Sequence, residues 1–300
     1  MRGLVIKSTG SRYGVELVSG QVVDARIKGR FRLQGIRTTN PLAVGDWVEV
    51  DGEQIVAIEE RRNYIIRKAS NLSKESHILA ANIDRVFLFV TLAQPETPNE
   101  FVDRFLVTAK AYDVPVVIVV NKVDVLEGEE DYLSNYCYLY RSLGYEVVPC
   151  SLVTGQGMDE LRGLVAGHVS LLAGNSGVGK SSFLNALEPT LQVKTGAISK
   201  AHSTGMHTTT FAEMFTVAGG KLIDIPGIKG FGLIDMEEPE IGHYFPEIFQ
   251  YAKQCKFGDC LHRNEPDCAV RKAVEEHLIS ESRYQSYLSI LADVSAGKYR

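Results

Sequence analysis

Eight residues from Gly174 to Ser181 have the composition and spacing of a loop that binds phosphate. They read Gly-Asn-Ser-Gly-Val-Gly-Lys-Ser and match the pattern G-x-x-x-x-G-K-[ST]. Glycines let the backbone curl until its N–H groups point at phosphate oxygens, and the helix that follows the loop adds its positive N-terminal end. The residues predicted to bind a nucleotide here are Gly174, Asn175, Ser176, Gly177, Val178, Gly179, Lys180, Ser181 and Ser182.

Two side chains of this loop and a second motif have expected roles in phosphoryl transfer. Lys180 is expected to reach the β- and γ-phosphates and to act in catalysis, and the Ser181 hydroxyl is expected to bind Mg²⁺. Asp224 begins an Asp-Ile-Pro-Gly sequence, a D-x-x-G pattern, and is expected to hold Mg²⁺ through water. The N–H of Gly227, which ends that pattern, is expected to contact the γ-phosphate and to sense its hydrolysis.

Residues Asn121-Lys-Val-Asp124 match the N-K-x-D motif that selects guanine in guanine-nucleotide-binding proteins. Guanine carries N–H donors at N1 and N2 on one edge, and the Asp124 carboxylate can accept from both. Adenine has an unprotonated N1 there, so the carboxylate would lose its partners, at a cost of about a thousandfold in binding. Asn121 is expected to tether the loop and the Lys122 stem to cover the base plane, with Val123 completing the motif.

A second base contact is expected after the next strand. Residues Cys150-Ser-Leu-Val-Thr-Gly-Gln-Gly157 resemble the S-A-x-T-G loop, whose backbone N–H groups approach guanine O6. Ser151 is therefore a predicted nucleotide-binding residue, and Leu152 stands where alanine is usual. Two base motifs and a phosphate loop, each at the end of a buried strand, together predict a GTP site.

The polar stretch of residues 205–210 reads Gly-Met-His-Thr-Thr-Thr. We expect Thr208 or Thr209 to bind Mg²⁺ and the γ-phosphate, and the sequence leaves the choice between them open. Many signalling GTPases place glutamine after D-x-x-G to orient the attacking water, but this chain has Ile228. We therefore hypothesise that His207 positions the water; the alternative is a surface histidine without a role.

The chain around these motifs alternates strands and helices, as in a parallel sheet covered on both faces. Continuous apolar runs predict buried strands, and amphipathic segments predict helices. The expected strands are Ile83–Thr91, Val114–Val120, Glu146–Cys150, Val169–Ala173 and Lys221–Asp224. The expected helices are one capped by Asn99, then Asp131–Leu143, Met158–Ala166 and one from Ser181.

The motifs occur in a rotated order, because the base motifs precede the phosphate loop and most GTPases have them last. A circular permutation explains this order. The helix ending at Ala166 runs almost directly into the strand at Val169, which joins the usual termini. The new cut follows the D-x-x-G motif, so we expect Gly227 to lead straight into a C-terminal domain.

Residues 1–66 are predicted to form a small β-barrel of the OB type. Its five expected strands are Leu4–Ser8, Tyr13–Val18, Val22–Ile27, Asp46–Val50 and Gln54–Ile58. Residues 1–37 carry eight Lys or Arg against two acids, while the whole chain has a net charge of −5. This basic end either faces RNA phosphate or is a solvated surface, and charge alone does not decide between them. Residues 67–82 are polar and aperiodic and are expected to be a linker.

Three cysteines and a histidine gather near the C-terminus: Cys255, Cys260, His262 and Cys268. Three thiolates and one imidazole suit a closed tetrahedral zinc site, whose role is structural because no position is left open. One zinc per chain is expected to stabilise a small helical domain. The predicted architecture is an OB barrel (1–66), a linker (67–82), a circularly permuted α/β P-loop GTPase domain (83–236) and a helical zinc-binding domain (237–300).

Composition is that of a globular protein, with 45% hydrophobic and 23% charged residues. The longest apolar stretch, near Val114–Val120, is far short of the ~20 residues that a membrane helix needs. The N-terminal apolar segment is too short for a signal peptide. We expect a cytoplasmic monomer that contacts no membrane.

The motif order, the Gly-Met-His-Thr-Thr-Thr stretch and the run from Cys255 to Val270 resemble those of the circularly permuted, small-ribosomal-subunit-dependent GTPases of bacteria, the RsgA or YjeQ family. The resemblance covers nearly the whole chain. It implies a slow GTPase that acts in late maturation of the small (30S) ribosomal subunit and is stimulated by that subunit. It also favours RNA binding by the basic barrel, since OB folds commonly bind RNA.

Two other functions remain open. One is a nucleotide-gated RNA-binding module whose hydrolysis is incidental, and the other is a permuted GTPase that acts on another ribosomal particle. Turnover with and without small subunits, and co-sedimentation with separated subunits, distinguish them.

Overall fold

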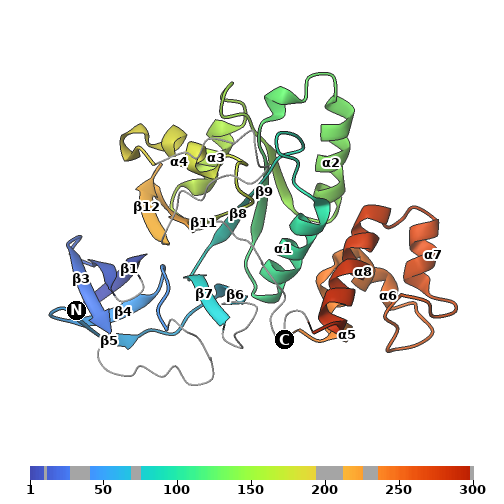
Figure 1. Cartoon of the computed structure of the whole chain (residues 1–300), viewed down its shortest axis with the longest axis horizontal. Coiled ribbons are helices and arrows are strands. Elements are labelled where there is room, and N and C mark those ends of the chain that lie inside the picture. The colour runs from blue at the N-terminus through green and yellow to red at the C-terminus, as the bar shows by residue number, and fades with distance from the viewer. Residues whose placement is uncertain (10–11, 28–40, 69–75, 194–211, 226–235, 298–300) are drawn as a thin grey trace.

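Figure 1 shows the computed structural model of the chain, which describes residues 1–9, 12–27, 41–68, 76–193, 212–225 and 236–297. Three parts follow one another along the chain: a small β-barrel, a sheet flanked by helices, and a helical unit at the C-terminal end. Among the helices within these ranges, none is both long enough and apolar enough to cross a membrane.

The N-terminal part is a closed five-strand barrel. Its strands are β1 (Arg2–Ser8), β2 (Tyr13–Leu17), β3 (Val22–Ile27), β4 (Trp47–Asp51) and β5 (Gln54–Ile58). They pair in the order β1-β2-β3-β5-β4, and β4 returns to pair with β1, which closes the barrel. Alternate residues point inward, so Val5, Val15, Val48 and Ile55 are fully buried in its core. The predicted five-strand barrel is confirmed.

A two-stranded hairpin follows the barrel, formed by β6 (Tyr64–Lys68) and β7 (Ser76–Ala81). Residues 67–82, expected to be a linker, therefore contain a strand that the sequence did not predict. The contacts are made by the apolar end of this strand: Ile78 and Leu79 are buried, and the Ala81 amide donates to the Val44 carbonyl at 3.0 Å. The sequence of this strand does not alternate between apolar and polar residues, so it gave no signal. The strand is stabilised by packing against the barrel.

The central part is a mostly parallel sheet in the order β10-β9-β8-β11-β13-β12. The strands are β8 (Arg85–Val90), β9 (Val116–Val120), β10 (Glu146–Pro149), β11 (Val169–Ala173), β12 (Glu213–Val217) and β13 (Gly220–Asp224). The first five strands of this order run parallel, as predicted, and the connection between α3 (Met158–Val165) and β11 takes only residues 166–168. This short connection is the join of the permuted domain.

Helices cover both faces of this sheet. They are α1 (Asn99–Ala111), α2 (Glu130–Ser142), α3 (Met158–Val165) and α4 (Lys180–Leu187). Strand β8 shows the two-sided burial: Leu88 packs in one core cluster with Phe105 of α1, and Phe89 packs in the other with Phe183 of α4. The predicted cap of α1 was wrong, because Asn99 is its first helical residue and Pro98 occupies the cap position without a side-chain bond.

Strand β12 was not predicted. It lies at the edge of the sheet and pairs antiparallel with β13. It also pairs with barrel strand β1 at Lys7 and Glu213, whose side chains form a 2.8 Å ion pair. The barrel and the central sheet are therefore hydrogen-bonded into one eleven-stranded sheet.

The C-terminal part consists of short helices around one apolar cluster. They are α5 (Glu238–Ile241), α6 (Pro246–Ala252), α7 (Ala269–Glu275) and α8 (Glu281–Ser295), with a 3₁₀ turn at Gly242–Tyr244. Buried Phe245, Ile248, Tyr287 and Leu291 form the centre of the cluster. Helix α8 packs along α1 of the central domain (Figure 1).

Candidate nucleotide site and metal centre

The phosphate loop connects β11 to α4, as its motif requires. Gly174, Gly177 and Gly179 have φ angles of +133°, +85° and +107°, which side-chain-bearing residues rarely adopt. A Cβ atom at Gly174 would clash with the Phe89 carbonyl, and one at Gly179 would clash with the Asn121 amide. The glycines are therefore required both for the curl of the backbone and for the close approach of neighbouring strand ends.

Lys180, the first residue of α4, lies inside this loop. Its Nζ donates to the carbonyl oxygens of Gly174 and Asn175, both at 2.7 Å. Burial lowers the pKa of Lys180 to about 8, and the charge of Asp224 opposes this shift. Asp224 ends β13 and is buried. Because its charge acts on Lys180, the aspartate predicted for Mg²⁺ and the lysine of the phosphate loop lie close enough to interact.

Nucleotide binding should take up a proton at Lys180 above pH 8. The free lysine is half neutral near its pKa of about 8, and phosphate oxygens favour the charged form, so binding raises this pKa. The affinity for GDP should therefore fall as the pH rises above 8. Calorimetry in buffers of different ionisation enthalpy at about pH 8.5 measures the proton uptake, which approaches one proton per site at most. Lys180→Met should abolish it; unchanged uptake in that variant would contradict the assignment.

The two base loops follow β9 and β10 and are tied to the phosphate loop. Asn121 donates from its backbone N–H to the Val90 carbonyl and from its side chain to the Val178 carbonyl, the latter at 2.8 Å. The Val123 amide donates to the Cys150 carbonyl at 3.2 Å. Asn121 thus fixes the base loop against the phosphate loop, and one amide links the two base loops.

The side chains of Asp124 and Ser151 meet across the two base loops. The Ser151 hydroxyl donates to Asp124 Oδ1 at 2.5 Å and accepts from the Thr154 amide at 3.1 Å. The sequence predicted Ser151 only through its backbone. The structure adds that its side chain orients the carboxylate predicted to read guanine.

Lys122 contacts the loop between β8 and α1, which none of the sequence motifs indicated. Its backbone has a φ of +64°, and its Nζ donates to the Gln94 carbonyl in the loop between β8 and α1. That loop is braced by the Thr91 amide, which donates to the Thr97 hydroxyl at 3.0 Å. Sequence inspection missed this loop because its contacts are made by backbone carbonyls, which carry no residue signature.

The remaining predicted residues are placed less completely. Ser176, Gly177, Ser181 and Ser182 lie in the phosphate loop or the first turn of α4. His207, Thr208, Thr209 and Gly227 lie outside the described residues. Their roles stay predictions, as does nucleotide binding by the residues that are described.

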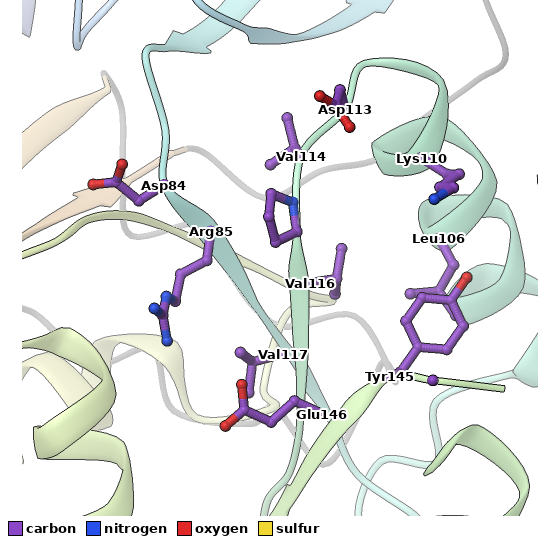
Figure 2. A pocket seen from close by; sticks show the side chains of 12 residues that line it. Asp84, Arg85, Leu106, Lys110, Asp113, Val114, Val116, Val117, Tyr145 and Glu146 are labelled. Carbon is purple, nitrogen blue, oxygen red and sulfur yellow. The ribbon is translucent and has the colours of Figure 1, made fainter. Parts of the chain in front are cut away.

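A cavity of about 460 Å³ opens at the opposite edge of the sheet (Figure 2). It is lined by the amino-terminal ends of β8, β9 and β10 and by α1, whereas the nucleotide motifs follow the carboxyl ends. Asp84 on its wall already accepts from Arg62 at 2.6 Å and from the Val169 amide at 2.7 Å. The cavity is therefore separate from the predicted nucleotide site.

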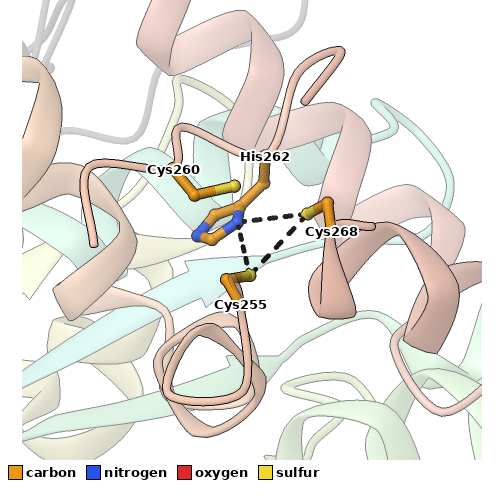
Figure 3. A group of neighbouring side chains, drawn as sticks. All are labelled: Cys255, Cys260, His262 and Cys268. Atoms are coloured by element: carbon orange, nitrogen blue, oxygen red, sulfur yellow. Dashed lines mark hydrogen bonds between the residues drawn. The ribbon is translucent and has the colours of Figure 1, made fainter. Parts of the chain in front are cut away.

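Cys255, Cys260, His262 and Cys268 converge in the C-terminal part (Figure 3), and their ligand atoms all lie within 4.8 Å of one another. The Sγ atoms of Cys255 and Cys268 are 3.9 Å apart, and His262 Nδ1 lies 3.6 and 3.4 Å from them. Tetrahedral zinc with usual bond lengths requires about 3.8 Å between two sulfurs and about 3.6 Å between sulfur and nitrogen. The donor set and its spacing fit zinc, and the sulfurs are too far apart for a disulfide.

The loop that carries His262 is held by its surroundings. His262 has a φ of +57°, a conformation uncommon for residues with side chains, and its carbonyl accepts from the Tyr284 hydroxyl at 2.7 Å. Glu265 accepts from the amides of Leu261 at 2.8 Å and Arg263 at 2.7 Å. Burial raises the pKa of the Cys260 thiol to about 12, because it disfavours the charged thiolate. A bound cation would favour the thiolate and oppose this shift.

Comparison with protein-family models matches almost the whole of the first two parts of the chain. The model described as the RsgA N-terminal domain matches residues 2–55, and the model described as RsgA GTPase matches residues 58–234. The chain belongs to the RsgA GTPase family. The rotated order of its motifs is therefore a property of an RsgA GTPase and not an accident of isolated matches.

Similar proteins extend the RsgA likeness over the full length. The chain is 58% identical to the small ribosomal subunit biogenesis GTPase RsgA of Bacteroides fragilis, covering 100% of this chain and 99% of that protein. It is 52% identical to the protein of the same name from Porphyromonas gingivalis, with the same coverage. Among solved structures, YjeQ from Thermotoga maritima matches with a TM-score of 0.76 at 34% identity, covering 97% of each chain. YloQ, described as a circularly permuted GTPase, matches with a TM-score of 0.72 at 32% identity over 100% of this chain and 96% of the other.

Proposed function

We propose that this chain hydrolyses GTP to GDP and phosphate in late maturation of the small ribosomal subunit, and that the subunit stimulates hydrolysis. The observation that carries the proposal is the bond from Asn121 to the Val178 carbonyl, which brings a guanine-selecting loop against a phosphate loop. The similar proteins named above are small ribosomal subunit biogenesis GTPases, which supports the choice of particle.

Residues of this chain perform distinct parts of the proposed reaction. Asp124, oriented by Ser151, accepts the guanine N–H donors and excludes adenine. Lys180 exchanges its loop carbonyl partners for the β- and γ-phosphate oxygens. Ser181, Thr208 or Thr209, and Asp224 through water would hold Mg²⁺, which would supply positive charge beside the phosphates.

We propose that His207 positions the attacking water, since Ile228 cannot do so. His207→Ala should lower subunit-stimulated turnover roughly a hundredfold, because a positioned proton acceptor contributes at least that much. Nucleotide affinity should stay within about twofold, since the residue is not assigned to binding. Single-turnover hydrolysis with saturating subunits measures the effect. Full stimulated turnover in the variant would remove His207 from the mechanism.

We propose that RNA contacts of the barrel use only part of its basic end. Arg2, Lys7 and Arg12 are already paired, with Glu59, Glu213 and Asp24 at 2.7, 2.8 and 2.8 Å. The other cations of residues 1–37 are Arg26 and, outside the described residues, Lys28, Arg30, Arg32 and Arg37. Charge reversal within this second group should weaken binding to rRNA more than charge reversal within the first.

Co-sedimentation with separated ribosomal subunits tests the proposal directly. The chain is mixed with small or large subunits in the presence of GDP or a non-hydrolysable GTP analogue, and GTP turnover is measured in parallel. We expect binding to the small subunit in the GTP-like state, and faster turnover with that subunit than without it. Binding only to large subunits, or nucleotide-gated RNA binding without faster turnover, would favour one of the two alternative functions. Binding to neither subunit in any nucleotide state would overturn the proposal.

A further inference from the structure

The C-terminal helices meet the GTPase domain through a buried group of charges. Arg283 of α8 donates from Nη1 to Asp103 of α1 at 2.6 Å, and from Nε to Glu247 of α6 at 2.6 Å. All three side chains are at most 7% exposed. Asp103 also accepts from the Tyr140 hydroxyl of α2 at 2.9 Å. Two carboxylates from different domains thus share one guanidinium.

A second charged contact lies further along the same pair of helices. Arg104 of α1 donates to Asp293 of α8 and to Glu100 of its own helix, both at 2.7 Å. The Ser289 hydroxyl of α8 donates to the same Glu100 at 2.9 Å. Polar bonds therefore join α1 to α8 along about three helical turns of α8, from Arg283 to Asp293.

Each cation that bridges the two domains has another partner within its own domain. If the domains separated, Arg283 would keep Glu247, to which it is bonded through both Nε and Nη2. Asp103 would keep the Tyr140 hydroxyl, and Arg104 would keep Glu100. The usual penalty for breaking a buried ion pair is the charge left without a partner. That penalty is reduced here, because these partners within each domain would remain bonded after the domains separate.

The interface also has an apolar part, formed on α1 by Val107 and Ala111. The buried apolar cluster of the C-terminal helices includes Val107 of α1, with Ala111 packed at its edge. The other buried apolar residues of α1, such as Phe105 and Leu106, belong to the core of the central sheet. The contact between the two domains thus combines this apolar patch with the buried ion pairs and hydrogen bonds described above.

We propose that this charged cluster is a releasable latch, which holds the C-terminal zinc domain on α1 and opens without unfolding either domain. Helix α1 follows directly on the loop whose Gln94 carbonyl binds the guanine-site Lys122. The latched helix therefore follows directly on a loop that contacts the predicted nucleotide site, and it lies along the zinc domain. This inference goes beyond the proposed function, because opening is a property of the chain without its ribosomal partner.

The latch predicts opposite effects for the two carboxylates that share Arg283. Asp103→Asn weakens the bond between domains and should favour the open state. Glu247→Gln removes the charge that competes for Arg283 and repels Asp103, so it should favour the closed state. A cluster that served only as folding core would be damaged by both changes in the same direction.

Single-molecule energy transfer in the full-length, zinc-loaded chain tests this. Fluorophores placed through unnatural amino acids at Tyr138 of α2 and at Leu278, both exposed, leave the cysteines free. Arg104→Gln should create a measurable low-transfer population. Adding Asp103→Asn should raise the ratio of open to closed molecules about tenfold, and adding Glu247→Gln instead should lower it severalfold.

The control is Arg162→Gln, which removes an exposed ion pair with Asp159 away from the interface and should leave the populations unchanged. Zinc content should stay at one per chain and basal GTP turnover should be unaffected in every variant. The latch is overturned if the Asp103 and Glu247 changes shift the populations in the same direction or not at all. It is also overturned if Asp103→Asn loses zinc, since the cluster would then be part of the folding core.

Discussion

Asp124→Asn should lower the affinity for GTP about a thousandfold while the chain stays folded. The carboxylate offers two acceptors to the N1 and N2 donors of guanine, and an amide replaces one of them with an N–H₂ that faces a donor. Asp124 Oδ1 accepts from the Ser151 hydroxyl at 2.5 Å, and an asparagine oxygen can still accept that bond. The substitution should therefore weaken recognition of the base and leave the conformation of the loop unchanged.

The same variant should gain affinity for xanthosine triphosphate, whose C2 carbonyl can accept from the new amide. Equilibrium binding of fluorescent, non-hydrolysable analogues of GTP and xanthosine triphosphate measures both changes. Asp159→Asn is the matched control, because Asp159 is a fully exposed aspartate on α3 and should leave both affinities unchanged. A loss of GTP affinity below tenfold would show that Asp124 does not read the base.

Cys260→Ser should remove zinc from the chain and unfold the C-terminal helices. The four ligand atoms lie within 4.8 Å of one another, and a closed site with three ligands loses most of its affinity for the ion. Helix α7 begins one residue after Cys268, and Tyr284 and Tyr287 of α8 bind the carbonyls of His262 and Leu261. Loss of the ion therefore releases the loop on which two helices depend.

Elemental analysis should fall from one zinc per chain towards none, and amide exchange should become fast in α7 while β8 and β9 stay protected. Cys137→Ala, which removes a buried thiol of α2 outside the cluster, should keep zinc and the protection of α7. Stoichiometric zinc in Cys260→Ser, or folded wild-type chain without any metal, would contradict a structural zinc site.

Much of the central domain was predictable because its signals are local. Strands buried on both faces read as apolar runs, so β11 was placed at its observed bounds and β8 and β9 within two residues. The phosphate loop and the base loops were predicted by residue type, because phosphate and guanine each demand particular groups. Strands β7 and β12 were missed because one is apolar only at its end and the other depends on pairing with β1 and β13.

By itself the sequence predicted the chemistry: a loop for phosphate, a carboxylate for guanine, four ligands for zinc and a permuted order of motifs. These four predictions follow from residue types at short spacing along the chain, and they do not depend on how distant segments pack. Only the tertiary structure decided how the parts are joined. The Ser151–Asp124 bond, the support of Lys122 by Gln94 and the Asp103–Arg283–Glu247 cluster link residues distant in sequence, and no local pattern specifies which burial will bring them together.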